Sequence, residues 1–168
     1  MKNRGVAYWQ EDEPQDGEAC QKIVYIGTMD AKLHGVDADT GEPCAGFGDE
    51  GVVDVNQWNT VNDKWPLSLL QPPTVYHDTL FLGWAGKDWT DSAGPPGTVF
   101  ALDARTGALK WMFHALPNDV VSRTGTANVW ASMSIDPERG LLYLPVSSPS
   151  PNYYGGNRLD EIPLATSV

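Results

Sequence analysis

The feature that most constrains the fold of this chain is a turn sequence that occurs twice. Residues 37–41 read Asp-Ala-Asp-Thr-Gly and residues 103–107 read Asp-Ala-Arg-Thr-Gly, so the two copies lie 66 residues apart. In such a turn the Asp side chain binds backbone N–H groups and the Gly takes a positive φ. Repetition at a fixed period marks repeat architectures. A strand, this turn and a second strand together are typical of one blade of a β-propeller.

Short apolar or alternating segments bounded by turn residues predict an all-β chain, because helical periodicity is almost absent. The predicted strands are 5–9, 23–28, 33–36, 52–55, 72–76, 79–83, 99–102, 109–113, 130–135, 141–146 and 164–168. They make roughly two to three four-stranded blades. Closed propellers do not leave blade faces and strand edges uncovered. Residues 1–168 are therefore expected to be a fragment of one larger propeller domain.

Charge and hydropathy exclude several classes of partner. The net charge of −11 argues against nucleic acid, which requires a basic face. No apolar run approaches the roughly 20 residues that span a bilayer. Residues 1–4 lead directly into an expected strand without the apolar region of a signal peptide. We therefore expect either a cytosolic protein or a chain whose first residue is not the natural start.

Two cysteines, Cys20 and Cys44, lie on either side of the first repeat. Their spacing fits no zinc motif, and two thiols are too few for a closed structural zinc site. Two alternatives remain open at this point. The pair forms a disulfide in an oxidising compartment, or it remains as two buried thiols.

Five segments, taken together and in order, resemble the quinoprotein dehydrogenases, which carry pyrroloquinoline quinone (PQQ) on an eight-bladed propeller. These segments are 3–9, 103–111, 128–130, 136–145 and 148–158. Within that family the chain looks most similar to the glucose/quinate/shikimate-type branch, which the placement of the two cysteines also suits. The resemblance implies oxidation of an alcohol, sugar or polyol, with electrons passing to ubiquinone or a cytochrome. It further implies a periplasmic location, with inner-membrane association through a segment outside residues 1–168.

The resemblance assigns four residues to PQQ. Trp130 matches the tryptophan that forms the floor under the quinone; the alternative is a core Trp at a strand start. Arg4 matches the arginine that pairs with a PQQ carboxylate, for which a guanidinium is well suited; the alternative is a surface arginine. The backbone of Ala85 and Gly86 is expected to lie against the quinone rim.

Three residues match positions that the family uses around a Ca²⁺ or Mg²⁺ ion. Asp88 falls where an acidic ligand is expected in a glycine-rich loop, with Asp91 as a competitor for the same role. Ser148 and Ser150 lie where relatives use an Asn and a hydroxyl ligand. Oxygen donors suit such hard cations. The alternatives are a solvated loop aspartate and ordinary turn chemistry in a Ser/Pro segment.

The family's catalytic Asp base falls beyond Val168, so no catalytic residue is assigned and residues 1–168 alone are expected to be inactive. Trp9 and the 84–97 loop are expected to shape the mouth of the pocket. The alternative function is a non-catalytic propeller of the same repeats that acts as a scaffold or binding module. Such a scaffold has no reason to combine Arg4, Asp88 and Trp130.

Overall fold

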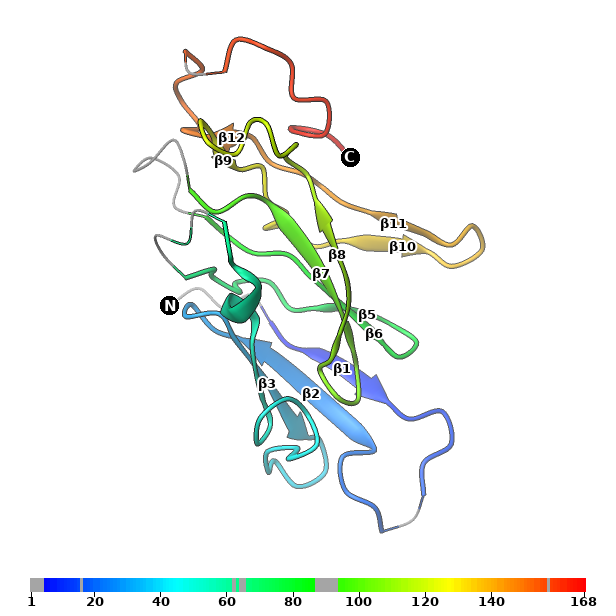
Figure 1. Cartoon of the computed structure of the whole chain (residues 1–168). Coiled ribbons are helices and arrows are strands. Elements are labelled where there is room, and N and C mark those ends of the chain that lie inside the picture. The colour runs from blue at the N-terminus through cyan, green and yellow to red at the C-terminus, as the bar shows by residue number, and fades with distance from the viewer. Residues whose placement is uncertain (1–4, 16, 62, 64–65, 87–93, 157) are drawn as a thin grey trace.

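The computed structural model describes the chain except residues 1–4, 16, 62, 64–65, 87–93 and 157. It contains two four-stranded antiparallel sheets and the beginning of a third, stacked one above another (Figure 1). The first sheet has the order β1-β2-β3-β4, formed by β1 (Ala7–Gln10), β2 (Lys22–Gly27), β3 (Lys32–Asp37) and β4 (Val52–Asp54). The second has the order β5-β6-β7-β8, formed by β5 (Thr74–Tyr76), β6 (Thr79–Leu82), β7 (Thr98–Asp103) and β8 (Leu109–His114). Two sheets and part of a third confirm the predicted partial propeller.

Shorter elements connect and follow these sheets. A 3₁₀ helix, η1 (Val55–Trp58), follows β4, and β10 (Ser134–Asp136) pairs with β11 (Leu141–Tyr143) in the third sheet. Two strands that the sequence did not predict, β9 (Gly125–Thr126) and β12 (Pro149–Ser150), pair with each other. In the described part of the chain, no helix is long and apolar enough to cross a membrane.

Strand β7 is buried on both of its faces. Phe100 and Leu102 belong to the hydrophobic core shared with the first sheet, whereas Val99 belongs to a second core that contains Val129 and Val146. Successive side chains of a strand point to opposite faces, so the continuous apolar run of β7 contacts both neighbours. Strands β2 and β3 instead alternate between buried and partly exposed residues, as expected when only one face is packed.

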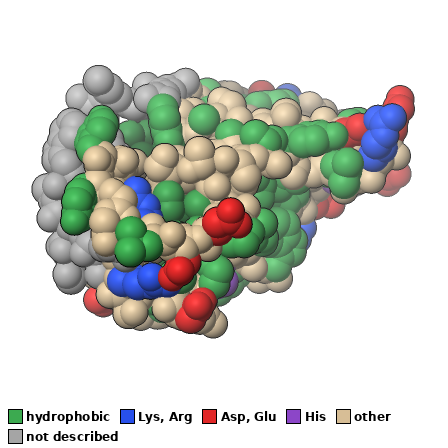
Figure 2. Space-filling view, turned by 90° about the horizontal axis from the view of Figure 1, so that it is seen from above, with side chains coloured by type: hydrophobic (Ala, Val, Ile, Leu, Met, Phe, Trp, Pro, Cys, Tyr) green, Lys and Arg blue, Asp and Glu red, His purple; other side chains and the backbone are tan. Residues whose placement is uncertain are grey.

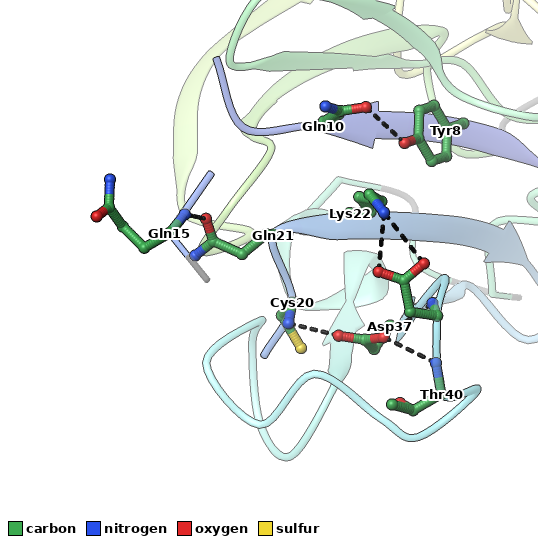
Figure 3. A network of polar contacts seen from close by, with 9 residues as sticks. Tyr8, Gln10, Gln15, Cys20, Gln21, Lys22, Asp37 and Thr40 are labelled. Atoms are coloured by element: carbon green, nitrogen blue, oxygen red, sulfur yellow. Dashed lines mark hydrogen bonds and ion pairs between the residues drawn. The ribbon is translucent and has the colours of Figure 1, made fainter. Parts of the chain in front are cut away.

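The repeated turns have the structure that the sequence predicts. Asp37 accepts hydrogen bonds from the backbone N–H groups of Asp39 and Thr40, both at 2.9 Å, and from that of Cys20 at 2.5 Å (Figure 3). These N–H groups, first that of Cys20, hold the pKa of Asp37 below its usual value. Gly41 at the end of the turn has a φ of +79°. The turn is therefore fixed by its own residues.

The second copy repeats this geometry. Asp103 Oδ1 accepts from the backbone N and from Oγ1 of Thr106, each at 2.9 Å, and Gly107 has a φ of +72°. Partial burial opposes ionisation of Asp103, but the hydrogen bonds from Thr106 and the hydrogen bond and positive charge of Lys110 together outweigh it and lower the pKa. The equivalence of the two turns confirms that the 66-residue offset is a structural repeat.

Contacts between the first two sheets involve side chains far apart in sequence. The hydroxyl of Tyr25, a fully buried residue, donates to the carbonyl of Ala104 at 2.6 Å. Trp9 Nε1 donates to Asp78 Oδ1 at 3.2 Å, and the guanidinium of Arg105 lies 5.5 Å from the Trp9 ring centroid. Trp9 is only 4% exposed. The expectation that Trp9 shapes a pocket mouth is therefore wrong, because these contacts bury it between the two sheets.

The cysteines form a disulfide between Cys20 and Cys44, 24 residues apart. It joins the segment before β2 to the loop between β3 and β4, and Cys44 is 1% exposed. The backbone N–H of Cys20 is one of the donors to Asp37. The disulfide and the first repeated turn thus stabilise the same end of the first sheet, and the alternative of two thiols does not hold.

The third sheet is only partly formed within the chain. The strand predicted at 164–168 is wrong: this segment makes one isolated bridge, between Ser167 and Val146. Thr166 N–H also donates to the carbonyl of Ser147 at 3.1 Å, but these bonds do not extend into the continuous ladder that a strand requires. Leu141, Tyr143, Leu164 and Val168 are exposed, and hydrophobic side chains cover much of this end when it is seen from above (Figure 2). This exposure is what an incomplete blade presents.

Replacing Tyr25 by Phe tests the bond between the sheets. The Tyr25→Phe variant leaves the buried carbonyl of Ala104 without its donor, which costs about 1–2 kcal/mol. We expect chemical denaturation to show a free energy of unfolding lower by that amount. Tyr8→Phe is the matched control, because Tyr8 is 49% exposed and its hydroxyl donates to the nearby, exposed Gln10. Equal losses in the two variants would contradict the assignment.

Removing the disulfide tests its contribution to the free energy of unfolding. The double variant Cys20→Ser/Cys44→Ser should lose about 3 kcal/mol of stability, because the cross-link restricts the unfolded chain. Guanidinium denaturation measures this loss. A reductant should shift the parent to the midpoint of the variant and leave the variant unchanged. Parent and variant with the same midpoint under oxidising conditions would be the contrary result.

Candidate functional site

The loops that carry the predicted site residues meet at one end of the stacked sheets. Residues 83–86 and 94–97, the paired strands β9 and β12, and η1 lie at the left of Figure 1, opposite the turns at 77–78 and 137–140. Single bridges connect these loops: Ser68 with Ala85, and Pro96 with Thr126. Residues from both complete sheets and from the partial one therefore approach one another at this end.

Trp130 lies at this end with an exposed side chain. It is 43% exposed, whereas its neighbours Asn128 and Val129 are buried. Its indole lines an open groove of about 630 Å³, together with Ser147, Ser148 and others. Within the described residues Trp130 is therefore not part of the hydrophobic core. A flat aromatic ring at the wall of a groove can stack on a planar ligand.

The two candidate serine ligands have different surroundings. Ser148 lines the groove beside Trp130, and its carbonyl accepts from Thr126 Oγ1 at 3.2 Å. Ser150 is only 1% exposed, and its Oγ accepts from the backbone N–H of Gly125 at 3.1 Å. Of the two, Ser148 is placed to meet a ligand in the groove directly. The metal role of both stays a prediction.

Ala85 and Gly86 lie at the start of the glycine-rich loop. The N–H of Ala85 donates to the carbonyl of Ser68 at 2.8 Å, which attaches this loop to the connection between the first two sheets. A Cβ on Gly86 would lie 2.7 Å from Thr126 Cγ2. The preceding Trp84 is 1% exposed, and its Nε1 has no hydrogen-bond partner among the described residues. Trp84 is thus a core residue that anchors the loop.

The described ends of this loop, at Gly83 and Gly97, lie against the segment that carries Trp130. A Cβ on Gly83 would collide with the carbonyl oxygen of Val129, and a Cβ on Gly97 with that of Ala127. Only glycine permits such a close approach of two backbones. The two ends of the loop therefore have fixed positions relative to residues 127–129, and so relative to Trp130.

Sequence reasoning missed the side chain that joins these parts. Asn128 is 4% exposed, and its Nδ2 donates to the carbonyl of Trp84. Its Oδ1 accepts from Ser147 Oγ at 2.8 Å, and its own carbonyl accepts from Ser147 N–H at 3.0 Å. Asn128 precedes Val129 and Trp130 in the 128–130 segment, which the sequence singles out only through its resemblance to the quinoprotein dehydrogenases. The signal that could have identified Asn128 is a polar residue within an apolar segment.

A second asparagine also contributes to the groove. Asn152 lines it, and the Oδ1 atom of Asn152 is buried without a hydrogen-bond partner among the described residues. Buried polar atoms without a partner are rare in folded proteins. Together, Ser148 and Asn152 give the groove a neutral polar lining beside an aromatic wall.

Arg4 and Asp88 lie outside the described residues, as does Asp91. Within the described part of the chain, no cluster of three or more His, Cys, Asp or Glu side chains could hold a metal ion. The described residues that line the groove also carry no charged side chain. The groove therefore fits the planar and hydrogen-bonding parts of PQQ. The charges that its carboxylates and a cation need are those predicted at Arg4 and Asp88.

Comparison with known proteins agrees with this geometry. A family model described as "PQQ: Glucose/ethanol/alcohol dehydrogenase, beta-propeller domain" matches residues 1–168. The chain is 32% identical to a quinate/shikimate dehydrogenase (quinone) of Acinetobacter baylyi, over 92% of this chain and 22% of that protein. It is 31% identical to the glycerol dehydrogenase large subunit of Gluconobacter oxydans, over 94% of this chain and 22% of that subunit. The chain thus spans about a fifth of these relatives.

Solved structures show the same fold. The quinohemoprotein alcohol dehydrogenase of Comamonas testosteroni superposes with a TM-score of 0.65 at 24% identity, covering 89% of this chain and 22% of that one. The alcohol dehydrogenase ADHIIG of Pseudomonas putida HK5 superposes with a TM-score of 0.62 at 26% identity, covering 76% and 20%. The stacked sheets are therefore blades of this kind of propeller.

Replacing Gly83 by Ala tests the close backbone contact. The added methyl group must displace Val129, and overpacking of this kind costs about 2 kcal/mol. Denaturation should show that loss for Gly83→Ala. Gly46→Ala is the control, because nothing lies within 4 Å of a Cβ at Gly46. The contact would be disproved if Gly83→Ala unfolded at the parental midpoint.

Proposed function

Because the chain belongs to the family of PQQ-dependent glucose/ethanol/alcohol dehydrogenase β-propellers, we propose that it is part of an enzyme that oxidises an alcohol, sugar or polyol. The observation that carries the proposal is the exposed indole of Trp130 on the wall of an open groove. The relatives' names support the substrate class, since they specify quinate or shikimate, glycerol and glucose. When bound, PQQ supplies a quinone that takes two electrons from the alcohol carbon.

The residues of this chain bind and orient PQQ in this proposal. Trp130 provides the stacking face, and the backbone of Ala85 and Gly86 borders the ring. Arg4 pairs with a carboxylate of PQQ, for which its planar fork of donors is suited. Asp88, Ser148 and Ser150 supply oxygen ligands for Ca²⁺ or Mg²⁺. The general base that removes the substrate proton is expected outside residues 1–168.

The proposed setting is the periplasm, with association to the inner membrane through a segment outside residues 1–168. The disulfide supports an oxidising compartment. Ubiquinone or a cytochrome is the proposed electron acceptor, and the name of the quinate/shikimate relative specifies a quinone. The remaining blades of the propeller are the intramolecular partners, and the exposed apolar face of β11 supports their presence.

Replacing Trp130 by Ala tests the proposal in the full-length protein. Loss of the stacking face should raise the dissociation constant of PQQ about fivefold, because such aromatic contacts contribute about 1 kcal/mol beyond their buried area. Calorimetric titration of the apo protein with PQQ measures this constant. Trp111→Ala is the matched control, because Trp111 is also 43% exposed but lies on β8.

The Trp111→Ala variant should bind PQQ as the parent does. A parent protein that does not bind PQQ would indicate the scaffold function instead. Equal binding by the Trp130→Ala variant and the parent would show that Trp130 is not the floor of the site. Dye-linked oxidation of quinate, glycerol and glucose by the loaded parent then identifies the substrate.

A further inference from the structure

Asn128 joins three segments that carry predicted site residues. Through Nδ2 it holds the carbonyl of Trp84, which precedes Ala85 and Gly86. Through Oδ1 and its own carbonyl it holds Ser147, the neighbour of Ser148. Along the chain, it lies two residues before Trp130. One buried amide therefore connects the loop at the quinone rim, the predicted floor and the groove wall.

The backbone before Asn128 is held in an unfavourable conformation. Thr126 and Ala127 have positive φ angles of 50° and 52°, which non-glycine residues rarely adopt. Several hydrogen bonds fix them: Thr126 N–H donates to Pro95 at 2.8 Å, and Ala127 N–H donates to Ser148 at 3.3 Å. Strained backbone of this kind persists only where its surroundings impose it, and it gathers at functional sites. Here it directs the amide of Asn128 toward Trp84.

The side chain at position 128 has to supply both a hydrogen-bond donor and a hydrogen-bond acceptor, as an amide does. The Trp84 carbonyl needs a donor, and the Ser147 hydroxyl needs an acceptor. Aspartate has the same shape but is only an acceptor when ionised, so it would face the Trp84 carbonyl without a proton to donate. An apolar side chain would satisfy neither partner. Asparagine supplies both groups at this buried point.

We propose that Asn128 is a positioning residue that fixes the separation between the Trp84–Gly86 segment and Trp130, and so sets the gap into which PQQ fits. This role rests on the proposed function of the groove. Asn128 itself is not assigned a contact with PQQ. It acts through the two backbone segments that it holds.

The test compares three variants of the full-length protein. Asn128→Asp removes the donor to Trp84, and Ser147→Ala removes the hydroxyl that donates to Asn128. Asn56→Asp is the matched control, because the Asn56 side chain, on η1, accepts hydrogen bonds from Leu67 N–H and from Asn59 Nδ2, and an aspartate can accept both. Amide hydrogen exchange without PQQ is measured at Ala85 and Ser147. Calorimetric titration with PQQ measures binding.

For both Asn128→Asp and Ser147→Ala we expect exchange at Ala85 and Ser147 to be faster on the order of tenfold, because a buried hydrogen bond is lost. The PQQ dissociation constant should rise by a similar factor. The β2 and β3 amides should exchange as in the parent. Asn56→Asp should leave both readouts unchanged.

Two results would overturn the role of Asn128. One is parental exchange and parental PQQ affinity in Asn128→Asp. The other is a lower melting temperature with both readouts unchanged, which would show a merely structural residue. A parent that does not bind PQQ would instead refute the proposed function. In that case the exchange rates alone would still decide whether Asn128 holds the two segments together.

Discussion

Strand β7 is buried on both faces, and the rest of the structure depends on this burial. Its Phe100 side contacts the first sheet, and its Val99 side contacts the core that contains Val129. The candidate site lies where these two packings meet, since the loop that enters β7 carries Ala85 and Gly86. Loss of either packing would move one wall of the site relative to the other. The burial of this single strand therefore determines both stability and site geometry.

The site itself is held mainly by backbone. Gly83 and Gly97 let the loop approach residues 127–129 more closely than any side chain would permit. Two successive residues with positive φ, Thr126 and Ala127, then turn the chain toward Trp130. Such contacts leave little freedom for adjustment of the segment that leads to Trp130, so this wall of the groove is preformed. A preformed site avoids part of the entropy cost of ordering loops around a ligand.

The sequence predicted what depends on local interactions and missed what depends on distant ones. The turns at Asp37 and Asp103 are fixed by donors within three residues, with one further bond from Cys20, so their pattern was readable. Trp9 is buried by Asp78 and Arg105, which lie in the next sheet, and no local pattern indicated this. The prediction of a strand at 164–168 was wrong, because a strand requires a continuous ladder of hydrogen bonds with a partner strand. Asn128 likewise acquires its role only when the fold brings Trp84 and Ser147 to it.

The Lys and Arg side chains of the described residues limit which cations could pair with the carboxylates of PQQ. Six described Lys and Arg side chains form ion pairs with carboxylates: Lys22, Lys32, Arg105, Lys110, Arg123 and Arg139. The seventh, Arg158, donates to the carbonyls of Pro151 and Tyr154. In a chain of net charge −11, a ligand with three carboxylates therefore depends on cations other than these. Arg4, which lies outside the described residues, is the residue of this chain that the family resemblance predicts for this role.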